Sequence, residues 1–465
     1  MKRLTILALA ALFVLGSVMS AAAAEIEATG DFRFQWVWSD NLDFANSDNT
    51  NNNEDDFDAR QRFRCQIDIT QSENLRGVLA LEIGTWQWGN NALDNGGIIS
   101  TVAGSNGDIE VRRAFIDFNV PETDLQLRVG KFGLGLPTAV AGNPILNDEN
   151  VTGILATYPI NDMFAVAVVW ARAVDLDTNY TANSERTDEM DVFGIIVPVT
   201  LDYFTAQPYF VFASAGTQAV QPAVRETQSV VGSGTFGWPN SLGANSATNM
   251  YWAGLALDVD YFDPLTFGLD VAWGTTTAPS FEAYNRDGWY IAARADYRLD
   301  FMTPGLVVWW ASGNDDDFRN GDESIPFISG SFAGTTIAFD GSSLLDCNCM
   351  FDATAEGTWG IALLLQDISF VEDLTHTFRI AYVQGTDDED WVNAQYVAGV
   401  ARGDVLATTE SVWEIDLNTT YMIYENLSLV NEIGWAWANF DEDARNGWDE
   451  GAPAVKLGFG LQYTF

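Results

Sequence analysis

The chain has 465 residues, of which 65 are Asp or Glu and only 22 are Lys or Arg, so its formal net charge is −43. This charge argues against a nucleic-acid partner, because binding a phosphate backbone needs a basic surface. The aromatic content of 13% argues against disorder, since acidic disordered chains are poor in aromatic residues. One His and three Cys leave too few ligands for most structural zinc sites.

Residues 1–24 are predicted to be a signal peptide. Met1-Lys2-Arg3 gives a positive start, residues 4–18 are mostly apolar, and Ala22-Ala23-Ala24 offers small residues for cleavage. A transmembrane anchor is the alternative, but the apolar run is short for a membrane span. Residues 25–465 contain no second apolar stretch of that kind and no interdomain boundary, so we expect one exported domain.

The body of the chain alternates with a period of two residues. Between Gly30 and Trp38 every second side chain is aromatic, and the period returns at 265–273, 289–298 and 455–465. This pattern predicts strands with one apolar face and one face of small or charged residues. The second face would make a poor soluble core but suits a water-filled lumen. In lipid, only a closed barrel satisfies the backbone of such strands.

Short and long connections alternate along the chain. The short ones lie at 71–74, 121–124, 159–162, 201–204, 261–264, 301–304 and 423–426, with a longer one at 367–374. The long ones are polar and mostly acidic, for example 40–57, 89–107, 213–249, 312–357 and 385–410. This alternation predicts an all-β, transmembrane, antiparallel up-and-down barrel of about 18 strands, with 16 as the alternative.

Aromatic residues are sorted between the two ends of the predicted strands. Most of the 17 Trp lie near the long connections: Trp36, Trp38, Trp86, Trp88, Trp170, Trp252, Trp273, Trp289, Trp309, Trp310, Trp359, Trp413, Trp435 and Trp437. Phe and Tyr gather near the short turns, as at Phe118, Tyr158, Phe164, Phe204, Tyr261, Tyr297, Tyr421, Tyr424, Tyr463 and Phe465. Two aromatic girdles at the membrane interfaces would explain this sorting.

The final strand, 454–465, ends in Gly-Leu-Gln-Tyr-Thr-Phe and resembles the terminal strand of trimeric bacterial porins. In that family the last Phe is read by the barrel assembly machinery, which makes Tyr463 and Phe465 a predicted assembly signal. The stretch 110–132, with Arg112-x-Ala114-Phe115 and Gly130-Lys131 around a short turn, resembles the part of those porins that precedes an inward-folded constriction loop.

The likeness is greatest to the homotrimeric outer-membrane porins of sulfate-reducing bacteria. It implies a homotrimer in the outer membrane of a Gram-negative cell, in contact with membrane lipid and lipopolysaccharide. General porins of this type usually have 16 strands, which is why that count stays open.

Arginines mark the candidate pore lining. Arg60, Arg62 and Arg64 alternate on one predicted strand, so all three should point into the lumen. An Arg facing lipid at mid-depth would cost roughly 2–4 kcal/mol. If the loop 132–150 folds inward, its acids face a basic wall, and charged rings of this sort set pore selectivity. The predicted constriction comprises Arg33, Arg60, Arg62, Arg64, Arg112, Arg128, Lys131, Asp148 and Glu149. The alternative is that these arginines pair with the loop acids and pin the loop, and both can hold.

Two acidic segments, 315–321 and 441–447, are near repeats that resemble a calcium loop, but Arg occupies the position of the third ligand. Solvated acidic loops are the preferred interpretation, with Asp315, Asp317, Asp441 and Asp443 as weak calcium candidates. Divalent cations at such loops could bridge to lipopolysaccharide. Cys347 and Cys349 are expected as a strained local disulfide or free thiols, and Cys65 should face outward.

The sequence shows no nucleophile–His–acid pattern, so no enzyme activity and no cofactor are predicted. We predict a porin that passes small hydrophilic solutes and ions by diffusion. The alternatives are a porin selective for a sugar or an anion, a barrel-anchored enzyme or surface receptor, and a secreted all-β lectin or adhesin.

Overall fold

The computed structural model describes residues 24–42, 44, 55–88, 109–175, 189–216, 248–277, 285–317, 320–339, 341–344, 351, 355–397, 405–442, 444 and 453–465. The predicted signal peptide up to residue 23, Cys347, Cys349 and Asp443 lie outside these residues. In the described ranges no helix has the length and apolar character needed to cross a membrane.

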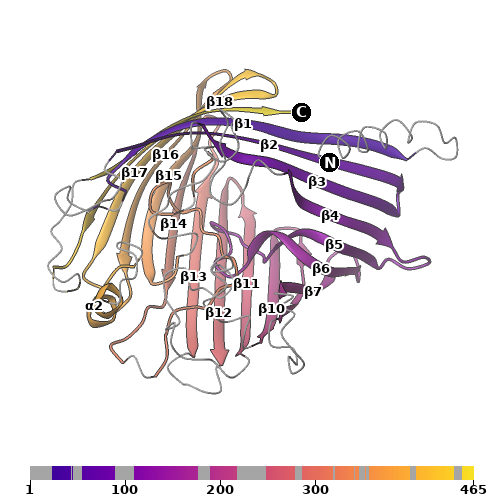
Figure 1. Cartoon of the computed structure of the whole chain (residues 1–465), viewed down its shortest axis with the longest axis horizontal. Helices are drawn as coiled ribbons and strands as arrows, with labels where there is room; N and C mark the ends of the chain where they lie inside the picture. Colours follow the sequence, from indigo (N-terminus) through magenta and orange to yellow (C-terminus); the bar gives the residue numbers. More distant parts are fainter. Residues whose placement is uncertain are drawn as a thin grey trace, which may run out of the picture.

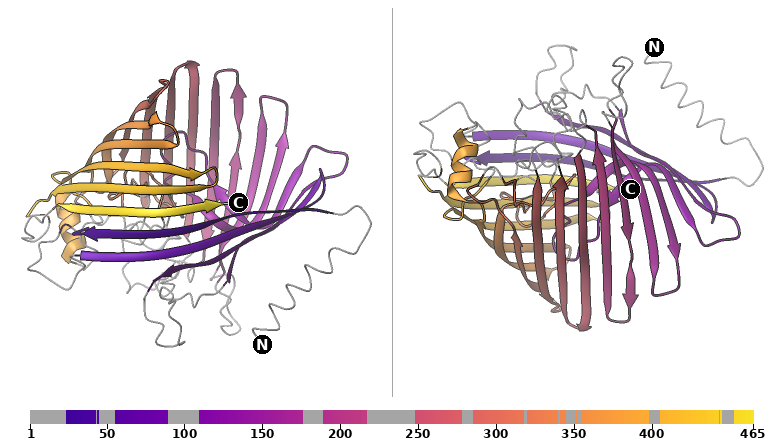
Figure 2. Two further views of the ribbon diagram at one scale, coloured as in Figure 1. Left: turned by 90° about the horizontal axis from the view of Figure 1, so that it is seen from above. Right: turned by 90° about the horizontal axis from the view of Figure 1, so that it is seen from below.

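The described chain forms 19 antiparallel strand segments that follow one another around a curved wall (Figures 1 and 2). A helix, α2 (Glu389–Val397), lies in the connection between β16 and β17. The segments are β1 (Glu25–Asp40), β2 (Asp55–Ser72), β3 (Leu75–Gln87), β4 (Ile109–Asn119), β5 (Gln126–Gly135), β6 (Asn147–Pro159), β7 (Ala165–Asp175), β8 (Glu189–Ile196), β9 (Val199–Leu201), β10 (Phe204–Ala215), β11 (Thr248–Phe262), β12 (Leu265–Thr277), β13 (Arg286–Tyr297), β14 (Thr303–Ala311), β15 (Thr358–Val371), β16 (Leu374–Gly385), β17 (Ser411–Tyr424), β18 (Leu427–Asn439) and β19 (Ala454–Thr464).

The sheet closes on itself, because β1 pairs with β2 on one side and with β19 on the other. β8 and β9 both pair with β10 and are separated only by Val197 and Pro198. Pro has no backbone N–H to give to a ladder, which accounts for the interruption. Taken as one crossing, β8 and β9 reduce the 19 described segments to 18 strands. The prediction of 18 strands is therefore confirmed, and the alternative of 16 is wrong.

The described strands are joined by short turns at one end of the barrel and by long connections at the other. Two-residue turns follow β2, β9, β11, β15 and β17. The turn after β15 is shorter than the predicted segment 367–374, because β15 continues to Val371 through two register shifts. β1 begins and β19 ends on the short-turn side.

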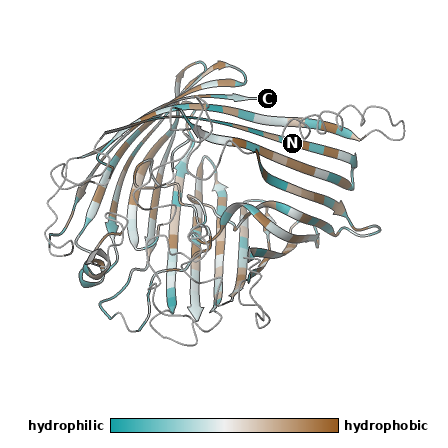
Figure 3. Ribbon diagram, in the orientation of Figure 1, coloured by the Kyte–Doolittle hydropathy of each residue, from teal (hydrophilic) through white to brown (hydrophobic). Residues whose placement is uncertain are grey.

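Successive residues of each strand point to opposite faces, and hydrophobic and hydrophilic residues alternate along many of the strands (Figure 3). On β14, Leu306, Val308 and Trp310 are 38–43% exposed, whereas Val307 and Trp309 between them are buried. Exposed Trp lie near the long connections of β13 to β18, and exposed Tyr near the short turns. The predicted alternation and the two aromatic bands are thus confirmed.

Two tryptophans do not belong to the outer band in which the sequence placed them. Trp252 and Trp309 are only 0% and 3% exposed, and both point into the barrel. Trp309 lies between the outward-facing Val308 and Trp310, so a shift of one residue decides its face.

Phe465 completes the closing seam between β19 and β1. Its backbone N–H donates to the carbonyl of Gly30 at 3.1 Å, and its carbonyl accepts from the Gly30 N–H at 3.0 Å. Its ring stacks on Phe63 with centroids 6.2 Å apart and contacts Phe32 at 6.1 Å. The last residue therefore joins three strands.

Deletion of Phe465 should lower the folded fraction of the barrel. The seam loses two backbone hydrogen bonds worth about 1 kcal/mol each and ring contacts worth about 0.5–1.5 kcal/mol. The folded fraction can be measured as heat-modifiable protein on gels. Phe370→Ala is the control, because Phe370 is 74% exposed and packs on Phe301, away from the seam. Equal folded fractions for the deletion and the wild type would contradict this role.

Candidate functional site

A first segment folds into the barrel between β5 and β6. We call residues 136–146 inner loop 1. The carboxylate of Asp270, which faces inward on β12, accepts from the N–H groups of Ala139 at 2.8 Å and Val140 at 3.1 Å and from the Thr138 hydroxyl at 2.8 Å. The Asn143 side chain donates to the Tyr209 hydroxyl at 3.2 Å. The inward-folded loop predicted from the sequence is therefore confirmed, and it crosses the lumen towards β10 and β12.

A second segment also lies inside, between β14 and β15. We call the described residues of 320–344 inner loop 2. It runs alongside inner loop 1: the N–H of Ile328 donates to Ile145 at 2.8 Å, that of Ser331 to Asn143 at 2.8 Å, and that of Ala333 to Ala141 at 2.7 Å. The two loops thus form one layer across the lumen.

The sequence predicted the connection 312–357 to be one of the long, polar and mostly acidic loops, and that prediction is wrong for the segment 320–344. The apolar residues of this segment are the sequence signal for its burial. They are at most 4% exposed: Ile325, Ile328, Phe332, Ile337 and Phe339. Such residues are unusual in a solvated loop.

The inner loops pack against aromatic residues of the wall. Phe332 contacts the rings of Tyr290, Trp309 and Phe339 at centroid distances of 6.4, 5.1 and 4.9 Å. The indole N–H of Trp252 donates to the carbonyl of Pro326 at 2.6 Å. Trp252 and Trp309, which the sequence predicted to lie in the outer aromatic band, therefore hold inner loop 2 inside the barrel.

The inner wall on β1 to β5 carries arginines, whose side-chain exposure ranges from 10% at Arg62 to 40% at Arg76. Arg33 is opposite Arg62 and Asp31 is opposite Arg64 in the β1–β2 register, so all four side chains share the inner face. Arg128 on β5 is opposite Asp117 on β4 and lies 4.4 Å from the ring centroid of Phe115. We call the described arginines of this region the arginine wall: Arg33, Arg60, Arg62, Arg64, Arg76, Arg112, Arg113 and Arg128.

Carboxylates on β1 to β4 form ion pairs with the arginine wall. Arg64 and Arg112 contact Glu82 at 2.6 and 3.3 Å. Further pairs are Arg33 with Asp31 at 3.2 Å, Arg62 with Asp31 at 3.8 Å, Arg60 with Asp58, and both Arg76 and Arg128 with Asp117 at 2.7 Å. Four arginines thus share two carboxylates, Asp31 and Glu82, and the charge of Arg64 repels those of Arg62 and Arg112. Around Asp31 and Glu82 the arginine wall therefore keeps a local excess of positive charge.

Two residues of the predicted constriction belong to a strand instead of the loop, and a third lies on the outer face. Asp148 and Glu149 belong to β6 rather than to the loop, and their side chains lie outside the described part. Lys131 is opposite Ala114 and Thr152, in the outward-facing register of Val129, and donates to the Val111 carbonyl at 2.9 Å. Lys131 is therefore on the outer face.

Arg112 reaches the lumen only because β4 has a register shift beside it, at Ala80 and Leu81 of β3. A bulge inserts a residue into one strand and rotates the side chains that follow. Without it, Arg112 would share the outward face of Ala114 and Ile116, which is 51% exposed.

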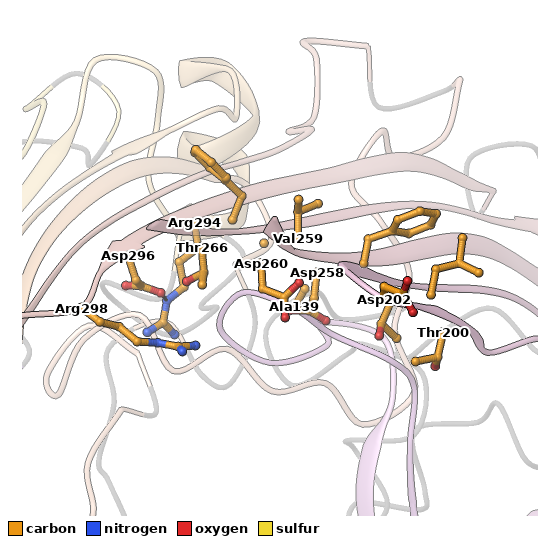
Figure 4. A pocket seen from close by; sticks show the side chains of 15 residues that line it. Ala139, Thr200, Asp202, Asp258, Val259, Asp260, Thr266, Arg294, Asp296 and Arg298 are labelled. Carbon is orange, nitrogen blue, oxygen red and sulfur yellow. Dashed lines mark hydrogen bonds and ion pairs between the residues drawn. The ribbon is translucent and has the colours of Figure 1, made fainter. Parts of the chain in front are cut away.

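A cavity of about 510 Å³ lies near the short-turn end of the lumen, next to Ala139 of inner loop 1. Figure 4 shows Arg294 and Arg298 at one side of it, and Asp258, Asp260 and Asp202 further along. Both signs of charge therefore line this compartment.

The long connections are at one end of the barrel, which we call the mouth. Buried charged residues link different connections there. Arg286, at the start of β13, contacts Glu356 and the Ser324 hydroxyl and lies 4.0 Å from Asp322. Asp387 accepts from the backbone N–H and the side-chain amide of Asn314 at 2.8 and 2.9 Å. Burial, together with the nearby charge of Asp322, raises the pKa of Asp387 to about 7, and Arg286 opposes this shift.

The weak calcium candidates do not come together. Asp315 accepts from the Asp317 N–H at 2.8 Å and from Asn320 at 3.1 Å, and Asp441 lies in another connection. In the described part of the chain no group of three or more His, Cys, Asp or Glu side chains could hold a metal. His376 bonds Thr419 at 2.8 Å on the outer face, where Cys65 also lies.

A closed barrel with an oily outer face, aromatic bands and loops inside defines a porin-type transmembrane barrel. No family model and no curated protein matches the chain. Solved structures do: OpdQ of Pseudomonas aeruginosa is 12% identical, with 95% of this chain and 98% of that chain covered and a TM-score of 0.51.

OccK8 (OprE) of Pseudomonas aeruginosa is also 12% identical, with 95% and 98% covered and a TM-score of 0.52. The outer membrane protein OprD of the same organism is 13% identical, with 94% and 93% covered and a TM-score of 0.50. At such identities the likeness establishes the fold. The finer resemblance to porins of sulfate-reducing bacteria stays a prediction.

The mouth should loosen as the pH rises. A carboxyl group with a raised pKa in the folded state stabilises that state fully below its ordinary pKa of about 3.9, and the contribution is lost as the pH passes about 7. Amide hydrogen exchange at Asn314, corrected for its intrinsic rate, should be slower at pH 5 than at pH 8. Asp387→Asn keeps an acceptor for Asn314 and should remove the difference. The same pH dependence in Asp387→Asn would show that another group titrates.

Proposed function

We propose that the chain is a porin of a Gram-negative outer membrane, through which small hydrophilic solutes and ions diffuse passively. The observation that carries this proposal is a lumen narrowed by two inner loops and faced by the arginine wall. The oily outer face supports a membrane location, and OprD, which shares the fold, is described as an outer membrane protein.

Selectivity for anionic solutes is the favoured refinement. Around Asp31 and Glu82 the arginine wall is only partly neutralised, since four arginines pair there with two carboxylates, and charged linings set the selectivity of pores. A sugar-selective porin is the second candidate. Aromatic and polar groups line parts of the lumen, but the arginines favour the anion.

The same proposal includes assembly as a homotrimer and recognition of Phe465 by the barrel assembly machinery. It also includes contact of the acidic loops with lipopolysaccharide through divalent cations. The chain is proposed to have no enzyme activity. A barrel-anchored enzyme or surface receptor is the alternative, and it differs in one measurable property, because it would conduct no ions.

Refolded full-length protein in planar bilayers under a salt gradient tests the proposal. Discrete conductance steps with a reversal potential on the anion side are expected. A folded barrel that produces no steps would overturn the channel function.

The double variant Arg62→Ala plus Arg64→Ala should shift the reversal potential towards cations and raise the conductance. Two positive charges leave the arginine wall, whose side chains reach the lumen. The shift should shrink between about 0.1 M and 1 M salt, as the Debye length falls from about 10 Å to 3 Å.

Arg172→Ala is the matched control for this variant. Arg172 lies on the outer face, opposite Asp191 and Thr152, and should leave the reversal potential unchanged. If the two variants behave alike, the arginine wall does not set selectivity.

A further inference from the structure

Three carboxylates of the inner wall are covered by inner loop 2. Glu414 and Asp416 face inward on β17, and Glu432 faces inward on β18. All three residues are at most 1% exposed. On a bare wall these three acids would outnumber the neighbouring cations Arg379, which lies 3.3 Å from Asp416, and Lys456, so the loop changes both the width and the charge of the passage.

Glu414 binds the backbone of the loop directly. Its Oε1 accepts from the N–H groups of Thr336 at 2.9 Å and Ile337 at 2.7 Å, and its Oε2 accepts from the Ala338 N–H at 2.9 Å. Asp416 accepts from the Thr336 hydroxyl at 2.5 Å. Hydrogen bonds to an ionised acceptor are among the stronger ones in proteins, so this contact fixes the loop at residues 336–338.

Glu432 fixes the loop a second time. Its carboxylate accepts from the N–H of Ser343 at 2.7 Å and from the hydroxyls of Ser342 and Ser343 at 2.6 Å each. From β19, Lys456 donates to the Thr336 carbonyl at 3.3 Å, and Gln462 donates to that of Ser343 at 3.1 Å.

The wall next to these acids is also shaped to receive the loop. A Cβ at Gly434 would lie 2.9 Å from the Ile337 side chain, and one at Gly460 would lie 2.7 Å from Leu344. At Gly458 a Cβ would collide with Leu344. The inward-facing glycines of β18 and β19 therefore form a seat, which is an observation independent of the carboxylates.

We propose that Glu414 and Glu432 are positioning residues that set the bore of the channel by holding inner loop 2 in this seat. When the loop leaves the seat, the lumen widens and Glu414, Asp416 and Glu432 face the passage. The proposal rests on the proposed channel function for its conductance readout, whereas the position of the loop can be measured without it.

Two variants release the loop by different means. Glu414→Gln plus Glu432→Gln keeps the side-chain shapes, but each amide retains only one acceptor oxygen and turns an NH₂ group towards donors. Gly458→Val fills the seat and leaves the carboxylates in place. Asn418→Ala controls for the first variant, since Asn418 is on the inner face of β17 and its Oδ1 has no partner in the described chain. Gly77→Val controls for the second, because a Cβ there meets nothing within 4 Å.

Hydrogen exchange of the full chain in detergent should speed up at residues 336–338 and 343 in both releasing variants, on the order of tenfold, because charged acceptors are lost or displaced. Single-channel conductance should rise on the order of twofold, since it follows the open cross-section. Larger sugars should enter liposomes that contain either variant. Only Gly458→Val should also shift the reversal potential towards cations, because it uncovers three acids against the two cations Arg379 and Lys456, whereas the Gln variant uncovers Asp416 alone. The controls should match the wild type.

Wild-type exchange and wild-type conductance in a folded Gln variant would overturn the proposal. Faster exchange with unchanged conductance would also overturn it, because the loop would then not set the bore. If the Gln variant does not fold, Gly458→Val decides by the same two measurements. A wild-type barrel that conducts no ions would contradict the proposed function, and the exchange data would still show whether the carboxylates hold the loop.

Discussion

The structure depends on one constraint: in the hydrocarbon of a membrane, every backbone N–H and C=O must find a partner within the protein. The chain meets it by pairing β19 with β1, so that each crossing of the described barrel has a paired neighbour on both sides. Closure in turn fixes the faces, because a strand in a closed ladder can send its side chains only outward or inward. The oily outer face and the charged inner face both follow from it.

A barrel of 18 strands encloses more space than its wall side chains fill. The inner loops narrow this space, but their own backbones bring unpaired polar groups into the lumen. Inward-facing carboxylates of the wall provide these partners. Asp270 accepts backbone hydrogen bonds from inner loop 1, and Glu414 and Glu432 accept them from inner loop 2. Acidic side chains on the inner face are therefore structural partners of the loops as well as surface charge.

The sequence predicted what is local and missed what is long-range. Two-residue alternation lies within single strands, so the barrel, the turn ends and the faces of Arg33, Arg60, Arg62, Arg64 and Arg128 could all be predicted. The hydrogen bonds of inner loop 2 to Glu414, Asp416 and Glu432 join residues 76–90 positions apart, and no local pattern encodes them. Lys131 and Trp309 were misplaced for a related reason, since a shift of one residue reverses the face of a strand position.

Inner loop 2 covers three carboxylates of the inner wall, so these acids do not line the passage that the arginine wall faces. Inner loop 2 contacts the wall at β11, β14 and β17 to β19 and hides the acids there, whereas the arginine wall lies on β1 to β5. A solute at the narrow level therefore meets guanidinium groups on one side and a loop of small and apolar residues on the other. Attraction of anions then depends on which acids the loop covers, and not on the overall charge of the chain. Pore width and pore charge are thus set together, by one segment resting on one part of the wall.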